Sequence, residues 1–313
     1  MAEFSSSGLS ALRSTQTAPE VRRFAASELE PLIEFLSVRI LETHQRCCPV
    51  SRKTAETNGS FVCQQPPNPV DGSEISSEHA PQPWRVLVGI AGIPGSGKST
   101  LAPRLEAGLN AVSRSQFCQC LLPVQAETKL QGNPRESHQE NTPGCPAAVA
   151  LVGMDGFHLT RAELDKFPDP KEAHRCRGAP WTFDLRAFWE RLHALKMKPG
   201  PVVFPTFDHA VKDPDSHGCV VETSTRVVVV EGLYILGTEE CPLPPNIFDV
   251  TIFIDTPKTV AADRVIKRHV ASGISRNLEE AKRRWDENDS QNADYILRQL
   301  KFAQPDAIIQ GDA

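Results

Sequence analysis

The residue types and spacing most suited to chemistry lie in a glycine-rich segment, Gly92–Ser99, which reads Gly-Ile-Pro-Gly-Ser-Gly-Lys-Ser. Glycines at this spacing allow backbone angles and close approach that a Cβ would prevent. Successive backbone N–H groups and the start of a following helix then face phosphate oxygens. Lys98 is expected to reach the outer phosphates, and Ser99 to offer its hydroxyl to Mg²⁺. The predicted nucleotide-binding residues of this Walker A pattern are Gly92, Ile93, Pro94, Gly95, Ser96, Gly97, Lys98, Ser99 and Thr100.

Two carboxylates follow apolar runs that favour buried strands, Ala147–Val152 and Val227–Val230. Side chains at the carboxyl ends of parallel strands meet at the edge where open α/β sheets bind ligands. Asp155 has the chemistry to accept a proton from an acceptor hydroxyl; an Asp before Gly is also a common turn residue. Glu231 is expected to orient Mg²⁺ or its bound water together with Ser99, and a structural ion pair is the alternative.

The elements that must position these residues alternate between strands and helices from Trp84 onward. This alternation predicts an α/β fold with a parallel sheet and crossover helices. The predicted strands are Arg85–Ile90, Ala147–Val152, Val202–Phe204, Arg226–Val230, Ile247–Ile254 and a closing edge strand at Asp306–Ile309. The predicted helices are Lys98–Leu109, Leu185–Leu195, Thr259–Ala271 and Leu278–Phe302, the last with a possible break.

The N-terminal part, residues 1–83, has a different character. A helix is predicted over about Glu20–Gln45, kinked or restarted at Pro31. It is expected to pack on the core, and a homodimer contact is the alternative. Polar segments on either side are predicted to be flexible, as is an insertion at about 113–146 within a kinase domain of 84–313.

Composition excludes several classes of protein. The net charge of −5 gives no sign of the basic surface typical of a nucleic-acid binder. Apolar runs are too short to cross a membrane. Nine cysteines include no Cys-x-x-Cys pair, which favours a reduced compartment, and we expect a cytoplasmic protein. The serines and arginines of Met1–Ser27 slightly resemble an organelle transit peptide, but Glu3 and Glu20 count against it.

The order of motifs carries a family resemblance. The Walker A pattern, Asp155-Gly-Phe-His158, and Arg177-Gly-Ala-Pro-Trp-Thr-Phe-Asp184 together resemble the superfamily of uridine kinase, phosphoribulokinase and bacterial pantothenate kinase. The order is more similar still to uridine kinase-like P-loop kinases of fungi and bacteria, some of them labelled fructose transport kinases. The resemblance covers Arg85 to Ala313. It implies the P-loop NTPase three-layer fold, a doubly wound parallel sheet with a helical lid, and the use of ATP and Mg²⁺.

The resemblance also assigns roles around the acceptor. It makes Asp155 the candidate general base and places His158 where uridine kinases have a tyrosine. Asp184 borders the acceptor pocket, or simply caps the next helix. Arg177 meets either a charged substrate group or solvent. The run Phe-Pro-Thr-Phe-Asp-His that ends at Asp208 and His209 either contacts substrate or forms a strand-end turn.

A basic helix is expected to close over the phosphates as the family's lid. Arg264 and Arg268 lie four residues apart, so they share one helix face. We expect Arg264 to bind the nucleotide and Arg268 to stabilise charge in the transition state; a solvated basic face is the alternative. Asn288 and Asn292 either contact the acceptor or lid, or cap the last helix.

The chain is therefore expected to be an ATP-dependent kinase that phosphorylates a hydroxyl of a small molecule, such as a nucleoside, a sugar or a pantothenate-like alcohol. Only two tyrosines, Tyr234 and Tyr295, are present, whereas uridine kinases use several around the nucleoside, so uridine itself is in doubt. The alternative is a regulatory or assembly NTPase that acts through a protein partner. A guanine-specific Asn-Lys-x-Asp is absent, which counts against a GTPase.

Overall fold

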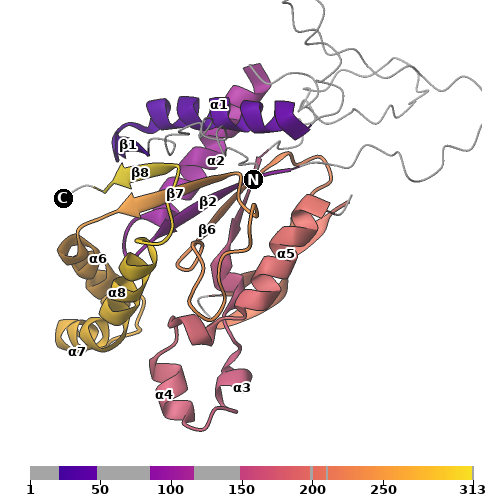
Figure 1. The fold of residues 1–313 in the computed structure, drawn as a ribbon. Coiled ribbons are helices and arrows are strands. Elements are labelled where there is room, and N and C mark those ends of the chain that lie inside the picture. The colour runs from indigo at the N-terminus through magenta and orange to yellow at the C-terminus, as the bar shows by residue number, and fades with distance from the viewer. Residues whose placement is uncertain (1–20, 48–84, 116–148, 198–199, 209–210, 312–313) are drawn as a thin grey trace, which may run out of the picture.

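The computed structural model describes residues 21–47, 85–115, 149–197, 200–208 and 211–311 (Figure 1). Six parallel strands form the main sheet in the order β1-β8-β7-β2-β6-β3. The predicted α/β class with a parallel sheet is thus confirmed. The strands of this sheet are β1 (Arg22–Ala25), β2 (Val86–Gly92), β3 (Val149–Gly153), β6 (Val227–Gly232), β7 (Val250–Asp255) and β8 (Ala307–Gln310).

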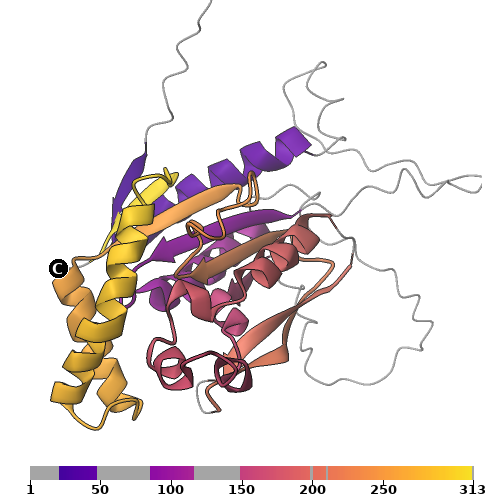
Figure 2. The same ribbon diagram turned by 60° about the horizontal axis from the view of Figure 1, so that its bottom comes forward.

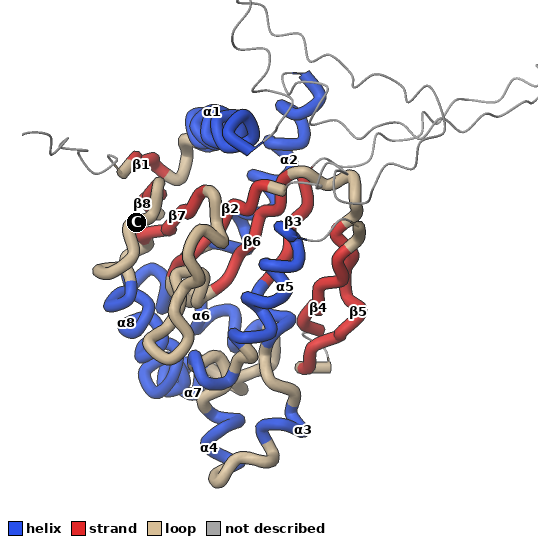
Figure 3. Tube along the Cα trace, turned by 45° about the vertical axis from the view of Figure 1, so that its right-hand side comes forward, coloured by secondary structure: helices blue, strands red, loops and turns tan. Residues whose placement is uncertain are grey.

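Helices cover both faces of this sheet, which gives three layers (Figures 1 and 3). One face packs against α1 (Leu29–Cys47) and α2 (Lys98–Ser115), and the other carries α5 (Leu185–Met197) and the C-terminal helices. The remaining helices are α3 (Arg161–Leu164), α4 (Pro170–Arg175), α6 (Lys258–Ala271), α7 (Leu278–Arg284) and α8 (Ser290–Gln299), with short 3-10 turns at Met154–Phe157 and Pro180–Thr182.

The sequence of β2 explains why both faces are covered. Every residue of this strand is buried. Side chains alternate between faces, so Val86, Val88 and Ile90 enter the core under α1 and α2, while Leu87 and Ala91 enter the core under α5. A continuous apolar run is the pattern expected for a strand buried on both sides.

The N-terminal segment differs in part from its prediction. The helix was expected from about Glu20, but residues Arg22–Ala25 form β1, which pairs with β8. The helix α1 begins only at Leu29, so Pro31 falls in its first turn, where its missing N–H costs nothing. The predicted packing of this helix on the core is confirmed. The predicted edge position of the last strand is wrong, because β1 lies outside β8.

The strand predicted at Val202–Phe204 does not join the main sheet. It is the first half of β4 (Val202–Asp208), which pairs only with β5 (Asp213–Val221) in a separate antiparallel hairpin. Figure 2 shows this hairpin beside the main sheet. A short apolar run cannot reveal which strand it will pair with, since pairing depends on distant segments.

The break predicted within Leu278–Phe302 is a π-helical turn at Trp285–Asp289 between α7 and α8. No helix of the described residues is long and apolar enough to cross a membrane. The helix α2 runs on to Ser115, and the rest of the predicted insertion lies outside the described residues. So do most of the polar segments predicted on either side of α1.

Candidate active site

The P-loop backbone has the conformation that phosphate binding requires. Gly95 and Gly97 adopt φ of +78° and +101°, angles that residues with a Cβ rarely take. A Cβ on Gly95 would stand 2.5 Å from the carbonyl oxygen of Ala261 in α6. Thr256, which sequence reasoning missed, stabilises the P-loop because its Oγ1 donates to the carbonyl oxygen of Ser96 at 3.0 Å. Only the tertiary arrangement identifies that residue.

Lys98 is buried at the first turn of α2, with 8% of its surface exposed. Its Nζ donates to two carbonyl oxygens of the P-loop, at 2.9 and 3.0 Å. Burial lowers the pKa of Lys98 to about 8, while the charges of Glu231 and Asp155 act to raise it and that of Arg268 to lower it. These four charged groups therefore lie close enough to interact.

Ser99 and Glu231 come together as predicted. The Ser99 Oγ lies 3.3 Å and 3.4 Å from the two carboxylate oxygens of Glu231. Gly153 lies opposite Glu231 in the strand register, and a Cβ there would be 3.7 Å from the carboxylate. Burial raises the pKa of Glu231, because its charge is partly removed from water.

These two side chains fit a magnesium ion. Mg²⁺ prefers oxygen ligands and, at nucleotide sites, takes one or two from the protein and the rest from phosphates and water. A hydroxyl beside a carboxylate at the mouth of the P-loop supplies such a pair. The described residues contain no cluster of three or more His, Cys, Asp or Glu suited to a metal, and a magnesium–nucleotide site needs none.

Asp155 lies two residues past the end of β3, in the 3-10 turn Met154–Phe157. The turn is fixed by close packing, since a Cβ on Gly156 would stand 2.0 Å from the carbonyl oxygen of Pro205 in β4. Strands β2, β6 and β3 are neighbours, so Lys98, Glu231 and Asp155 emerge from adjacent positions at one edge of the sheet. The structure thus assembles the predicted chemical groups.

His158 lies within an aromatic stack beside the turn that carries Asp155. Its ring centroid is 3.9 Å from that of Phe183 and 4.9 Å from that of Phe207. Its Nδ1 is 2.8 Å from the carbonyl oxygen of Asp155, so the imidazole is tied to the turn that carries the candidate base. Phe207 of β4 thereby brings the hairpin into the site, a contact that the sequence did not predict.

Arg177 is half-buried, and its guanidinium is held by the protein itself. Its guanidinium donates to the carbonyl oxygen of Leu159 at 2.6 Å and to that of Lys212, and pairs with Asp213 at 3.2 Å. It also lies 5.2 Å from the ring centroid of Phe207. Arg177 therefore joins the loop after Asp155 to the hairpin, which is a structural role.

The other two described acceptor candidates contact backbone. Asp184 Oδ1 accepts from the N–H of Ala187 at 2.9 Å, the geometry of a helix N-cap at the start of α5. Asp208 Oδ1 accepts from the N–H of Val211 at 3.1 Å in the turn that follows β4. His209 lies outside the described residues.

The lid arginines lie near the P-loop. An ideal Cβ on Gly97 would be 3.9 Å from Arg264 Nη1, so this guanidinium faces the phosphate-binding backbone. Arg268, one helical turn further along α6, acts electrostatically on both Lys98 and Glu231. Both side chains are exposed, which leaves them available to a bound ligand.

The loop after α4, which contains Arg177 and Gly178, is held by polar contacts from the π-turn and from the segment after β6. Asn288 Nδ2 donates to the carbonyl oxygen of Arg177 at 3.2 Å, and Asn292 Nδ2 donates to Asn288 Oδ1 at 3.4 Å. The hydroxyl of Tyr234 donates to the carbonyl oxygen of Gly178 at 2.7 Å. The sequence had left open whether the asparagines contact the acceptor or the lid, or cap the last helix. In the structure Asn288 contacts the loop after α4, and Asn292 contacts Asn288.

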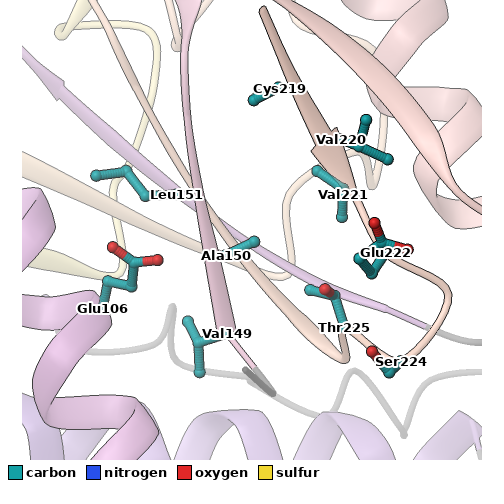
Figure 4. Close-up of a pocket in the computed structure, with 10 residues that line it drawn as sticks. All are labelled: Glu106, Val149, Ala150, Leu151, Cys219, Val220, Val221, Glu222, Ser224 and Thr225. Carbon is teal, nitrogen blue, oxygen red and sulfur yellow. The ribbon is translucent and has the colours of Figure 1, made fainter. Parts of the chain in front are cut away.

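A hollow in the surface lies away from these groups (Figure 4). It is lined by the start of β3, the end of β5 and the loop that leads into β6, with the carboxylate of Glu106 at one side. Phosphate-binding groups of α/β folds gather at the carboxyl ends of the strands. This hollow therefore is not part of the candidate active site.

No family model matches the chain. The sequence does match individual proteins. The chain is 32% identical over 232 residues to a Schizosaccharomyces pombe protein named "putative uridine kinase", a match that spans 72% of this chain and 83% of that protein. It is 28% identical over 323 residues to the "ATP-dependent kinase YFH7" of Eremothecium gossypii, across 76% of this chain and 97% of that protein.

Solved structures agree with these relatives. The "putative fructose transport system kinase" from Silicibacter sp. TM1040 is 30% identical with a TM-score of 0.53, over 72% of this chain and 90% of that one. YFH7 from Saccharomyces cerevisiae, 24% identical over 73% and 93% of the two chains, shares the fold with a TM-score of 0.57. The predicted resemblance is thus confirmed, and the chain belongs to the uridine kinase-like family of P-loop kinases.

Proposed function

We propose that this protein transfers the γ-phosphoryl group of ATP to a hydroxyl of a small-molecule acceptor. The observation that carries the proposal is the convergence of Lys98, Ser99, Glu231 and Asp155 at the carboxyl ends of three neighbouring strands. A simple switch NTPase needs the first three groups. A carboxylate at the position of Asp155, beside an aromatic wall, suits a kinase that must also orient an acceptor.

In this scheme, the P-loop amides and Lys98 bind the phosphates. The Lys98 ammonium exchanges its two backbone carbonyls for phosphate oxygens and neutralises charge as the phosphoryl group moves. Arg264 faces the P-loop and Arg268 faces Lys98 and Glu231, so closure of the lid adds positive charge at the transferring group.

Asp155 acts on the acceptor. Its carboxylate orients the hydroxyl and takes its proton as the oxygen forms a bond to the γ-phosphorus; the bond from that phosphorus to the β–γ bridging oxygen breaks, and ADP leaves. Ser99 and Glu231 would hold Mg²⁺, which when bound neutralises charge on the β- and γ-phosphates. The stack of His158 with Phe183 and Phe207 fixes the wall beside this acceptor position.

The acceptor class is a nucleoside, a sugar or a pantothenate-like alcohol. Relatives named as a uridine kinase and as a fructose transport system kinase support a hydroxyl acceptor in general terms. Among these, the scarcity of tyrosine argues for an acceptor other than uridine.

The test is the variant Asp155→Asn, which keeps the shape of the side chain and removes the base. ADP release is first screened against nucleosides, sugars and pantothenate with the wild-type protein. We expect the variant to bind a non-hydrolysable ATP analogue as wild type does and to lose acceptor phosphorylation by roughly 10²–10⁴-fold.

Two results would contradict the proposal. Retained phosphorylation by Asp155→Asn removes the base assignment. A wild-type protein whose ATP turnover is stimulated by no acceptor in the screen, but is stimulated by a protein partner, favours a regulatory NTPase.

A further inference from the structure

A cavity of about 160 Å³ lies between α4 and the lid and plays no part in the scheme above. Its two sides are joined by Arg175 of α4, which donates to the backbone carbonyl of Glu287 at 3.2 Å. The volume is sufficient for several water molecules or a small oxyanion. The lining residues are Arg175, Ile274, Ser275, Glu280, Arg283, Arg284, Glu287 and Asn288.

Two buried donors of this lining have no partner in the described part of the chain. Ser275 is 3% exposed, and its Oγ makes no hydrogen bond. The Nε of Arg284 is likewise buried and unpaired. Buried polar groups are nearly always satisfied in proteins, so two unpaired donors beside one cavity indicate an acceptor that enters it. The backbone N–H of Ser275 donates to the carbonyl oxygen of His269 at 3.0 Å, which fixes this residue in place.

The charge of the lining favours an anion. Its two carboxylates are already paired: Glu280 lies 3.0 Å from Arg276 Nε, and Glu287 lies 3.8 Å from Arg175. The side chains of Arg283 and Arg284, by contrast, make no hydrogen bond or close ion pair with another described residue, although Arg283 acts electrostatically on Glu280 and Arg284 on Asp289. Two unpaired guanidinium groups beside a free hydroxyl form a donor set suited to carboxylate or phosphate.

Ionisable groups of the π-turn and of α6 lie around Arg284. The acidic group that acts on it is Asp289 of the π-turn, which is not within ion-pair distance of it. Facing the same region are His269 and Arg268 from α6. Burial lowers the pKa of His269 to about 4, so this imidazole is neutral at pH 7 and adds no charge to the region.

We propose that this cavity is an anion-binding pocket, in which Ser275, Arg283 and Arg284 hold a carboxylate or phosphate group of a small molecule. The anion has two possible sources, an acidic group of the acceptor itself or a separate small anion that joins the lid to α4. The pocket as such does not depend on the proposed kinase reaction; the acceptor source does.

The first experiment measures binding of inorganic phosphate by calorimetry, with the P-loop filled by a non-hydrolysable ATP analogue and Mg²⁺. We expect binding to the wild-type protein and a loss of about tenfold or more in Ser275→Ala and in Arg284→Gln. Arg283→Gln, on the exposed side of the pocket, gives a smaller loss and keeps the test valid if a buried substitution prevents folding. Arg186→Gln on α5, 88% exposed, removes the same charge elsewhere and is expected to bind as wild type does.

The second experiment separates the sources. If the acceptor supplies the anion, only acidic alcohols in the screen are phosphorylated, phosphate competes with them, and Arg284→Gln raises the acceptor KM more than it lowers kcat. If a separate anion binds, phosphate changes the turnover of a neutral alcohol in the wild-type protein and not in Arg284→Gln. Either pattern supports the pocket.

The pocket is overturned if phosphate does not bind once the P-loop is filled, or if it binds equally to all four variants. That result leaves the proposed kinase activity untouched, since Asp155→Asn tests the activity without reference to this pocket.

Discussion

At the scale of single residues, the site depends on charges placed in a partly buried space. Lys98 carries its ammonium among backbone carbonyls, with the carboxylates of Glu231 and Asp155 near it. Such a group is held ready for phosphates but loses solvation energy, which is why burial lowers its pKa. The consequence is a nucleotide affinity that depends on pH.

Lys98 has a pKa of about 8 in the folded protein, and bound phosphates must raise it because they favour the charged form. Binding above pH 8 therefore requires uptake of a proton, and affinity should fall by up to about tenfold for each pH unit beyond it. Calorimetry of ATP-analogue binding in buffers of different ionisation enthalpy should give little proton uptake at pH 7 and about half a proton at pH 8. Lys98→Met should bind more weakly with no uptake; an affinity equal at pH 7 and pH 9 in wild type would refute the prediction.

At the scale of elements, the two helices that follow α6, which are α7 and α8, are joined through a π-turn. The extra residue of such a turn redirects side chains, and π-turns are frequent at functional sites. Here the turn places Asn288 against the carbonyl oxygen of Arg177, in the loop after α4, and Asp289 3.8 Å from His269 of α6. The contact between α6 and the π-turn is thus a pair of buried ionisable groups whose titrations oppose each other.

Burial raises the pKa of Asp289 from 3.8 to about 6 and lowers that of His269 from 6.5 to about 4. Between pH 3.8 and about 6 the folded protein holds a proton on Asp289 that the unfolded chain releases. The stability that Asp289 contributes is therefore lost as pH rises through 6. For His269 the unfolded chain binds the extra proton, so its contribution is lost as pH falls through 4. The two effects offset each other in wild type.

The substitution Asp289→Asn removes the contribution of the Asp289 carboxyl and leaves that of His269. Denaturant unfolding should show that wild type gains stability relative to this variant when pH is lowered from 7 to 5. The matched control is Asp286→Asn, which makes the same chemical change at an exposed position of the same turn. A difference for Asp289→Asn that is constant across this range would show that Asp289 does not titrate there.

At the scale of the whole molecule, two sheets are held together by a buried arginine at the start of β2. Arg85 is fully buried, and its guanidinium donates to four carbonyl oxygens at 2.7 to 3.3 Å, from Leu195, Gly200, Glu222 and Thr225. These carbonyls belong to the end of α5, the start of the β4–β5 hairpin segment and the loop that leads into β6. One side chain therefore ties the hairpin, which carries Phe207 of the aromatic stack around His158, to the main sheet.

Arg85→Met keeps most of the apolar stem and leaves these buried carbonyls without a donor. We expect a loss of roughly 2–5 kcal/mol in the free energy of unfolding, measured by denaturant titration. Arg186→Gln, at an exposed position of α5, should change stability by no more than about 0.5 kcal/mol. An effect of Arg85→Met as small as that of the control would mean that water satisfies the carbonyls.

The sequence by itself determined the features that local chemistry specifies. The P-loop, the carboxylates at Asp155 and Glu231, the strand–helix alternation and a possible break within Leu278–Phe302 follow from glycine conformations, apolar runs and short-range periodicity. It did not reveal β1, the separate hairpin, the role of Arg177 or the positions of Thr256 and Asn288.

Only the tertiary structure decided these, because each depends on segments far apart in the chain. Strand pairing is set by which edges meet, so β1 joins β8 across almost the whole sequence. Arg177 links two segments because its guanidinium donates to the carbonyl oxygens of Leu159 and Lys212, which are distant from it in the chain. The cavity between α4 and the lid arises in the same way, from donors that no spacing in the sequence brings together.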